Sequence, residues 1–100
     1  MQLDHPKFPD PSAYVRKHAI THELKCWPEY FEETISGGKT FEIRYDDRDF
    51  MVGDTIRLRE WEPSNEQYSG RECWRRVTYI TTWQQHPFFV VMALIEDTDC

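Results

Sequence analysis

Alternation of apolar and polar residues predicts several strands along the chain. In residues 20–26, Ile20, Leu24 and Cys26 share one face with His22, and the residues between them are polar. Since successive side chains of a strand point to opposite faces, this pattern predicts a strand with one buried face. The same reasoning predicts strands over residues 40–45, 55–61, 71–82 and 88–95.

One segment has helical character instead. Pro28 suits the first position of a helix, and the three glutamates in residues 29–33 complement the positive end of the helix dipole. Phe31 and Ile35 are four residues apart and share a face, and Gly37 or Gly38 supplies a left-handed stop. These signals predict a helix of about nine or ten residues.

Five or six strands and one or two short helices predict an α+β domain, built as a small β-barrel of mostly antiparallel strands. Residues 20–96 form this domain in our interpretation. Residues 1–19 are expected to form an arm that turns helical near Ser12–His18, and residues 97–100 an acidic tail. Within residues 71–82, we expect Cys73, Val77 and Tyr79 to share one face. Residues 88–95 are apolar throughout, as in a central strand.

Polar residues that are able to bind a ligand or take part in catalysis cluster directly after the helix stop. Lys39, Glu42 and Arg44 fall within six residues. In a strand, Glu42 and Arg44 share a face with Thr40, whereas Phe41 and Ile43 point the other way. We therefore expect the apolar pair to face the core and the polar residues to face a cleft, with Lys39 beside them. The alternative is an ordinary surface ion pair of little energetic value.

Composition restricts the class of protein. One hundred residues make one domain. No apolar run approaches the roughly 18 residues of a membrane helix, and the first residues do not resemble a signal peptide, so we expect a cytoplasmic protein. The three cysteines are widely spaced without a C-x-x-C pair, which argues against disulfides and a zinc site. Cys26 and Cys73 are expected to be buried thiols.

The net charge of −6 argues against a general nucleic-acid binder, which usually has a basic balance. The charge is unevenly distributed, however, because residues 81–100 carry acidic groups and no lysine or arginine. A basic groove within an acidic protein is compatible with the seven arginines of the middle segment: Arg44, Arg48, Arg57, Arg59, Arg71, Arg75 and Arg76.

Other polar residues receive structural interpretations. The aspartates of residues 46–49 lack calcium-loop spacing and are typical of a turn, and Arg48 is a candidate to fold back on Asp54. Gly53 and Asp54 are interpreted as a turn that sets strand register. His18 and His22 have no further ligand at suitable spacing, so we expect no metal, and His22 is expected to hydrogen-bond internally.

Several segments together resemble the ASCH group of the PUA-like superfamily, and within it a small bacterial and phage family of unknown function. The segments are His22–Lys25, Trp27-Pro28 with the helix that follows, Gly38–Arg44, Asp47–Phe50, Val52–Asp54, Leu58–Trp61, Tyr68–Arg71 and Val77–Ile80. The G-x-K-x-x-E-x-R pattern is the hallmark of the group. The resemblance covers about residues 22–94.

The resemblance implies a β-barrel with a helix beside a cleft that the G-x-K-x-x-E-x-R segment lines. PUA-like domains mostly bind RNA, and several relatives recognise modified bases. One bacterial ASCH branch removes the acetyl group from acetylated cytidine. It has a lysine where this chain has Lys39, but a catalytic threonine where this chain has Glu42, and its catalytic glutamate lies in an insertion without a match here.

We predict a nucleic-acid-binding module that uses a polar cleft and binds RNA or a modified base or nucleotide. Lys39 is expected to contact phosphate or a base carbonyl, and Glu42 to accept from an exocyclic amine. Arg44 suits phosphate or guanine, and Trp27 is placed to stack on a base. The candidate set is Trp27, Lys39, Thr40, Glu42, Arg44, Arg48 and Arg59.

Two alternatives stay open. The first is an amidohydrolase acting on a modified nucleoside such as acetylcytidine, with Lys39 and Glu42 as its catalytic residues; the carboxylate of Glu42 opposes the neutral amine that such a role needs. The second is a phage or bacterial protein-interaction factor that uses an acidic surface and aromatic residues such as Trp74 or Trp83. We expect no cofactor, metal or membrane partner, and a monomer.

Overall fold

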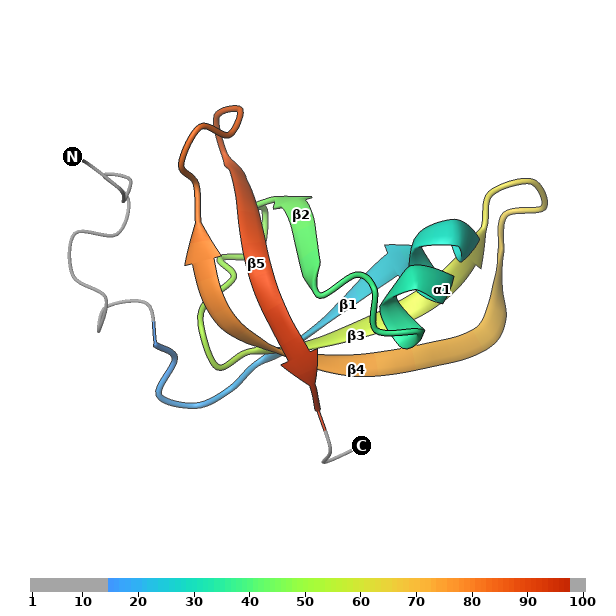
Figure 1. The fold of residues 1–100 in the computed structure, drawn as a ribbon, viewed down its shortest axis with the longest axis horizontal. Coiled ribbons are helices and arrows are strands. Elements are labelled where there is room, and N and C mark those ends of the chain that lie inside the picture. The colour runs from blue at the N-terminus through green and yellow to red at the C-terminus, as the bar shows by residue number, and fades with distance from the viewer. Residues whose placement is uncertain (1–14, 98–100) are drawn as a thin grey trace.

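The computed structural model describes residues 15–97, which form one five-stranded sheet and one helix (Figure 1). The strand order in the sheet is β1-β3-β4-β5-β2. Strands β1 and β3 are parallel, and the other three neighbouring pairs are antiparallel. The elements are β1 Thr21–Cys26, α1 Pro28–Ile35, β2 Phe41–Tyr45, β3 Thr55–Glu62, β4 Gln67–Thr81 and β5 Phe89–Glu96. The prediction of a small, mostly antiparallel α+β domain is confirmed.

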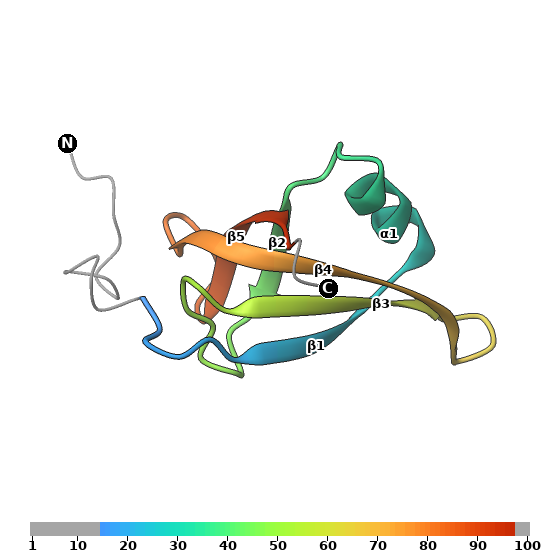
Figure 2. The same cartoon turned by 90° about the horizontal axis from the view of Figure 1, so that it is seen from below.

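The sheet curls into a half-barrel rather than closing. The long strand β4 pairs with β3 along its first part and with β5 along its second part, so it carries the bend (Figures 1 and 2). Arginine side chains, instead of backbone pairing, connect the edge strand β1 to the edge strand β2 and to the loop after β2. Arg44 Nη2 donates to the Lys25 carbonyl at 2.7 Å, and Arg48 Nη1 donates to the Glu23 carbonyl at 2.6 Å.

The core fills the inside of the half-barrel with alternate residues of each strand. In β1, His22, Leu24 and Cys26 are buried as the alternation predicted, whereas Ile20 precedes the strand and is exposed. The other buried apolar residues are Phe31, Phe50, Ile56, Leu58, Val77, Ile80, Val90, Met92 and Leu94. Burial of these side chains is the main stabilising contribution to the fold.

The helix is short and well defined. Trp27 occupies the N-cap, Pro28 follows at the first position, and Gly37 adopts φ +92° just beyond the C-cap. A residue without a Cβ is favoured at that backbone conformation, so the predicted glycine stop is confirmed. Phe31 and Thr34 are the buried residues of α1. The helix has eight residues, slightly fewer than the spacing predicted.

The prediction that Phe41 and Ile43 face the core is wrong. Glu42 between them is 4% exposed, whereas Phe41 and Ile43 are 43% and 51% exposed. The alternation of β2 was interpreted correctly, but its buried side carries the polar residues. Because β2 is an edge strand at the open side of the half-barrel, residues of both its faces border the cleft described below, and Phe41 and Ile43 lie outside the core.

Two further expectations are corrected. Tyr79 does not share the buried face of Val77, because a bulge between these residues shifts the register and leaves Tyr79 exposed. Arg48 does not fold back on Asp54; it reaches the edge of β1, and Arg16 pairs with Asp54 instead. Cys73 is half-buried rather than buried.

The start of the described chain is attached to the domain without a helix. Val15 forms a bridge with Val52, and the Arg16 backbone N–H donates to the Val52 carbonyl at 2.9 Å. The helix expected near Ser12–His18 is absent from its described part, residues 15–18, and its beginning lies outside the described residues. Asp97, assigned to the tail, is buried and accepts from Arg76 at 3.1 Å. Cys100 lies outside the described residues.

Candidate ligand-binding cleft

An open cleft of about 580 Å³ lies between the end of β1, the first turn of α1 and the edge strand β2. These three elements meet at the open side of the half-barrel, as Figure 1 shows for their ribbons. The lining residues are Lys25, Cys26, Trp27, Tyr30, Lys39, Phe41, Glu42, Ile43 and Arg44. They come from two separate stretches of sequence, residues 25–30 and 39–44.

Glu42 organises the polar side of this cleft. Its carboxylate is almost fully buried, and each of its oxygens accepts from a different cation: Oε1 from Arg44 Nε at 2.9 Å, and Oε2 from Lys39 Nζ. Lys39 Nζ also donates to the Phe41 carbonyl at 2.8 Å. A buried carboxylate between two cations is satisfied by charge and hydrogen bonds at once. Both cations are therefore held in fixed positions at the cleft.

Aromatic rings form the other side of the cleft. Trp27 and Tyr30 are 51% and 52% exposed, although they lie close to the core residue Phe31. Trp27 is placed by its position as the N-cap of α1, and Tyr30 lies in the first turn of the helix. The Lys39 ammonium lies 5.3 Å from the centre of the Phe41 ring. The cleft thus combines exposed ring faces with two anchored positive charges.

Cys26 is the thiol at the cleft, and it is buried. Desolvation by burial, with a smaller contribution from the Glu42 carboxylate, raises its pKa to about 11, although Lys39 and Arg44 act in the opposite direction. Because the thiolate is the nucleophilic form, this thiol is unreactive near neutral pH. Its role is to fill the space beneath the cleft.

The structure brings together four of the seven predicted site residues: Trp27, Lys39, Glu42 and Arg44. Thr40 lies outside the lining, with its backbone carbonyl accepting from Leu94. Arg48 bridges to β1, and Arg59 lies on the outer face of the sheet, 3.7 Å from the Tyr68 ring and paired with Glu23. Sequence reasoning missed Lys25 and Tyr30. Their proximity to Trp27 in a strand–helix junction was the available signal.

A comparison with known protein families assigns the chain to one of them. Residues 21–94 match a family described as "Domain of unknown function (DUF3850)". The chain belongs to the DUF3850 family. The matched range of this DUF3850 protein covers all of the sheet and helix except the last residues of β5, and it contains every residue that lines the cleft.

A curated relative of this DUF3850 protein comes from Escherichia phage P2, where it is described as "Uncharacterized 12.9 kDa protein in GpA 3'region". The two are 37% identical over 63 residues, which is 63% of this chain and 56% of the relative. The match therefore spans little more than half of the relative's length. Within residues 15–97 of the DUF3850 protein, no helix has the length and apolarity required to cross a membrane.

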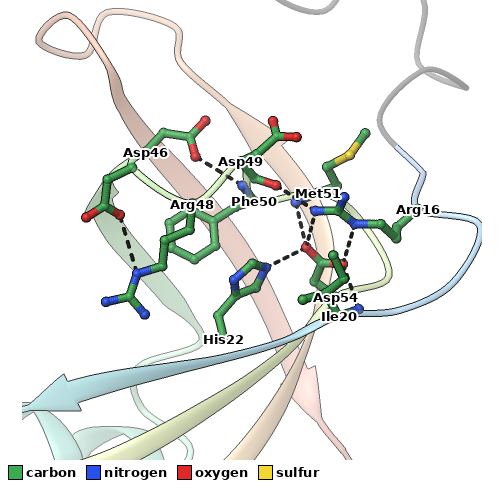
Figure 3. A network of polar contacts seen from close by, with 10 residues as sticks. Arg16, Ile20, His22, Asp46, Arg48, Asp49, Phe50, Met51 and Asp54 are labelled. Carbon is green, nitrogen blue, oxygen red and sulfur yellow. Dashed lines mark hydrogen bonds and ion pairs between the residues drawn. The ribbon is translucent and has the colours of Figure 1, made fainter.

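A second polar centre lies outside the cleft, around Asp54 (Figure 3). This carboxylate is fully buried, and His22 Nε2 lies 2.8 Å from its Oδ2. Arg16 donates to both oxygens, at 3.0 and 3.1 Å, and the Met51 backbone N–H donates at 3.0 Å. The internal hydrogen bond expected for His22 is thus confirmed, and the partner is a residue that the sequence presented as a simple turn.

The Asp54 centre connects three parts of the chain: the segment before β1 at Arg16, strand β1 at His22 and the loop before β3 at Asp54 itself. Burial alone raises the pKa of the Asp54 carboxyl. The hydrogen bonds from Arg16, His22, Met51 and Ile20 more than offset burial, so the pKa lies below its ordinary value. No group of three or more His, Cys, Asp or Glu in the described part of the DUF3850 chain is arranged to hold a metal ion.

Proposed function

We propose that this DUF3850 domain binds a nucleotide unit in its cleft, either free or within single-stranded RNA. The observation that carries the proposal is the buried Glu42 carboxylate, which holds Lys39 and Arg44 in place opposite the exposed ring of Trp27. A nucleotide presents the two chemical features that match this arrangement, an anionic phosphate and a flat base.

The anchored cations supply the phosphate contact in this proposal. A lysine ammonium has three donors and an arginine guanidinium five. Lys39 Nζ donates to Glu42 and to the Phe41 carbonyl, and the Arg44 guanidinium donates to Glu42 and to the Lys25 carbonyl. Donors remain on both groups for a phosphate or a base carbonyl. Each carboxylate oxygen of Glu42 keeps a further lone pair, which suits a hydrogen bond from the exocyclic amine of a base.

Local charge supports an anionic ligand. The cleft lining presents the cations of Lys39 and Arg44 against the single carboxylate of Glu42, although the whole chain carries a net charge of −6. Lys25 also lines the cleft, but its ammonium lies 3.8 Å from the centre of the Trp61 ring. A local excess of positive charge in a concave site attracts anions more strongly than the net charge of a protein indicates. Selectivity then depends on the cleft, because the acidic remainder of the surface repels bulk nucleic acid.

The exposed rings supply the base contact. Trp27 and Tyr30 present half-exposed aromatic faces beside the cations, and stacking of a base on such a ring contributes about 1–3 kcal/mol. Similarity of the Gly37–Arg44 segment to the ASCH hallmark supports the same proposal, since PUA-like domains mostly bind RNA. Binding is favoured over amide hydrolysis because Lys39 is engaged by Glu42 and the Cys26 thiol is protonated near neutral pH.

Binding of fluorescently labelled single-stranded RNA, measured by anisotropy at several salt concentrations, tests the proposal. We expect Lys39→Gln to weaken binding about tenfold and to reduce its salt dependence, and Trp27→Ala to weaken binding by a similar factor. Lys17→Gln and Trp83→Ala are the matched controls, because both residues are exposed and lie outside the cleft lining. Unlabelled nucleotides as competitors distinguish a free nucleotide from an RNA strand as the preferred ligand.

Equal effects of the cleft variants and of their matched controls would contradict the proposal. Undetectable binding of RNA and of every nucleotide competitor would contradict it as well.

A further inference from the structure

The outer face of strands β2 and β5 is apolar and exposed. Their antiparallel pairing places Phe41 opposite Ala93, Ile43 opposite Val91 and Tyr45 opposite Phe89. These six residues form three cross-strand pairs on the side of the sheet that points away from the core. We call them, together with the flanking Phe88 and Ile95, the β2–β5 face. Its most exposed members are Phe88, Tyr45, Ile95 and Ile43, each at 51–73%.

This face has the opposite character from a solvated sheet surface. A sheet with one face in water normally carries polar residues on that side. In β2 the polar residues Glu42 and Arg44 point into the half-barrel. The other three residues of the strand point outward, and all are apolar or aromatic: Phe41, Ile43 and Tyr45. The helix does not cover them, because α1 packs against β3. Contiguous apolar surface of this kind usually marks an interaction site.

Charge favours a second copy of the chain as the occupant. The residues of the β2–β5 face are all uncharged. Two cations border it, Lys39 beside Phe41 and Arg76 opposite Ile95, and each of them is paired with a carboxylate. Two chains that each carry a net charge of −6 repel one another over most of their surfaces. An uncharged face is where two such chains approach at least electrostatic cost. In a two-fold arrangement each copy presents the same face to the other.

The size of the face is compatible with a dimer. Phe41, Tyr45 and Phe88 are 43–73% exposed, and at about 150–250 Å² per aromatic side chain they leave roughly 300 Å² accessible. Ile43, Ile95, Phe89, Val91 and Ala93 add apolar area, as does the exposed Tyr79 beside Ala93 on β4. A standard interface buries about 800 Å² per partner, with an apolar centre and a polar rim.

We propose that the chain forms a two-fold symmetric dimer in which the β2–β5 faces of two copies pack together. The proposal departs from the monomer expected from the sequence, because the alternation of β2 did not reveal that its apolar side lies outside. It does not depend on the proposed ligand. Phe41 and Ile43 belong to the face and also line the cleft, so a dimer would place its two clefts beside the shared interface.

Sedimentation equilibrium of the full chain, over a wide range of protein concentration, tests the proposal. We expect the apparent mass to rise from that of the 12.1 kDa chain to about twice that value. Ile43→Lys places one positive charge from each copy at the centre of the face and is expected to raise the dimer dissociation constant at least 100-fold. Ile35→Lys is the matched control, because Ile35 is similarly exposed, at 45%, but lies at the end of α1.

Circular dichroism verifies that both variants are folded. A wild-type chain that stays monomeric at all concentrations would overturn the proposal, and the face would then belong to a different partner. A dimer that Ile43→Lys leaves intact, or that Ile35→Lys disrupts equally, would overturn it as well. If Ile43→Lys does not fold, Val91→Lys on the neighbouring strand provides the same test.

Discussion

Arg44 Nε donates to Glu42 Oε1 at 2.9 Å, and these residues are two positions apart on the same edge strand. Residues with this spacing share one face of a strand, so the pair is built into the local backbone. The same guanidinium reaches the Lys25 carbonyl across the open side of the half-barrel. One side chain therefore connects β2 to β1 and positions the carboxylate that anchors Lys39.

Removing the charge of Glu42 is expected to destabilise the fold as well as the cleft. Glu42→Gln keeps the shape but leaves Lys39 and Arg44 without their shared carboxylate. Since hydrogen bonds to charged groups contribute about 1.5–3 kcal/mol, we expect the free energy of unfolding to fall by about 2 kcal/mol in urea denaturation. Glu72→Gln is the control; its exposed pair with Arg57 should change the free energy by less than about 1 kcal/mol. Equal stability of both variants would contradict a structural role for Glu42.

The buried Asp54 centre predicts a loss of stability in acid. Its pKa is lowered in the folded state, so its contribution is complete above the pKa of the unfolded chain and is lost as pH falls through the folded value. The unfolded pKa of aspartate is about 3.9, so the decline should begin below about pH 4. Urea denaturation between pH 7 and pH 2 measures it.

Asp54→Asn provides the matching variant. Loss of a buried charge that pairs with Arg16 and His22 should lower the free energy of unfolding at pH 7 by about 3 kcal/mol and flatten its decline in acid. Asp47→Asn, an exposed aspartate in the preceding loop, should leave both quantities nearly unchanged. An Asp54→Asn variant with the wild-type acid profile would show that another carboxyl controls the decline.

Cys26 should resist thiol reagents in the native protein. Its thiol is buried, and its pKa is raised to about 11, so little thiolate is available at pH 7.5. We expect mass spectrometry after brief iodoacetamide treatment to find Cys26 unmodified, with modification appearing once urea unfolds the chain. The half-buried Cys73 is the internal comparison. Rapid native labelling of Cys26 would contradict the packing beneath the cleft.

Local patterns predicted much of the fold because they act within a few residues. The alternation in β1, with Pro28 and Gly37 at the ends of the helix, fixes each element without reference to the rest of the chain. Alternation cannot, however, tell which side of an edge strand becomes buried. Glu42 is buried between Phe41 and Ile43 because the half-barrel curls over the polar side of β2, and that depends on the strand order.

Long-range partners were the other limit of sequence reasoning. Asp54 has the local signature of a turn, and its partners His22 and Arg16 lie 32 and 38 residues away. Arg48 is closer in sequence to Asp54 but reaches Glu23 instead. At the cleft, Lys39, Glu42 and Arg44 were accessible to prediction because they lie on one short segment. Lys25 and Tyr30 join them only through folding.

A titration of the ¹⁵N-labelled protein, followed by NMR, tests the nucleotide-binding cleft most directly. The ligands are the four ribonucleoside monophosphates, their nucleosides, acetylcytidine and short single-stranded RNAs. We expect saturable shifts at the Trp27 indole and at the Lys39–Arg44 amides, larger for nucleotides than for the matching nucleosides, with little change around Asp54. Shifts that are absent throughout this panel, or that fall outside the cleft, would contradict it.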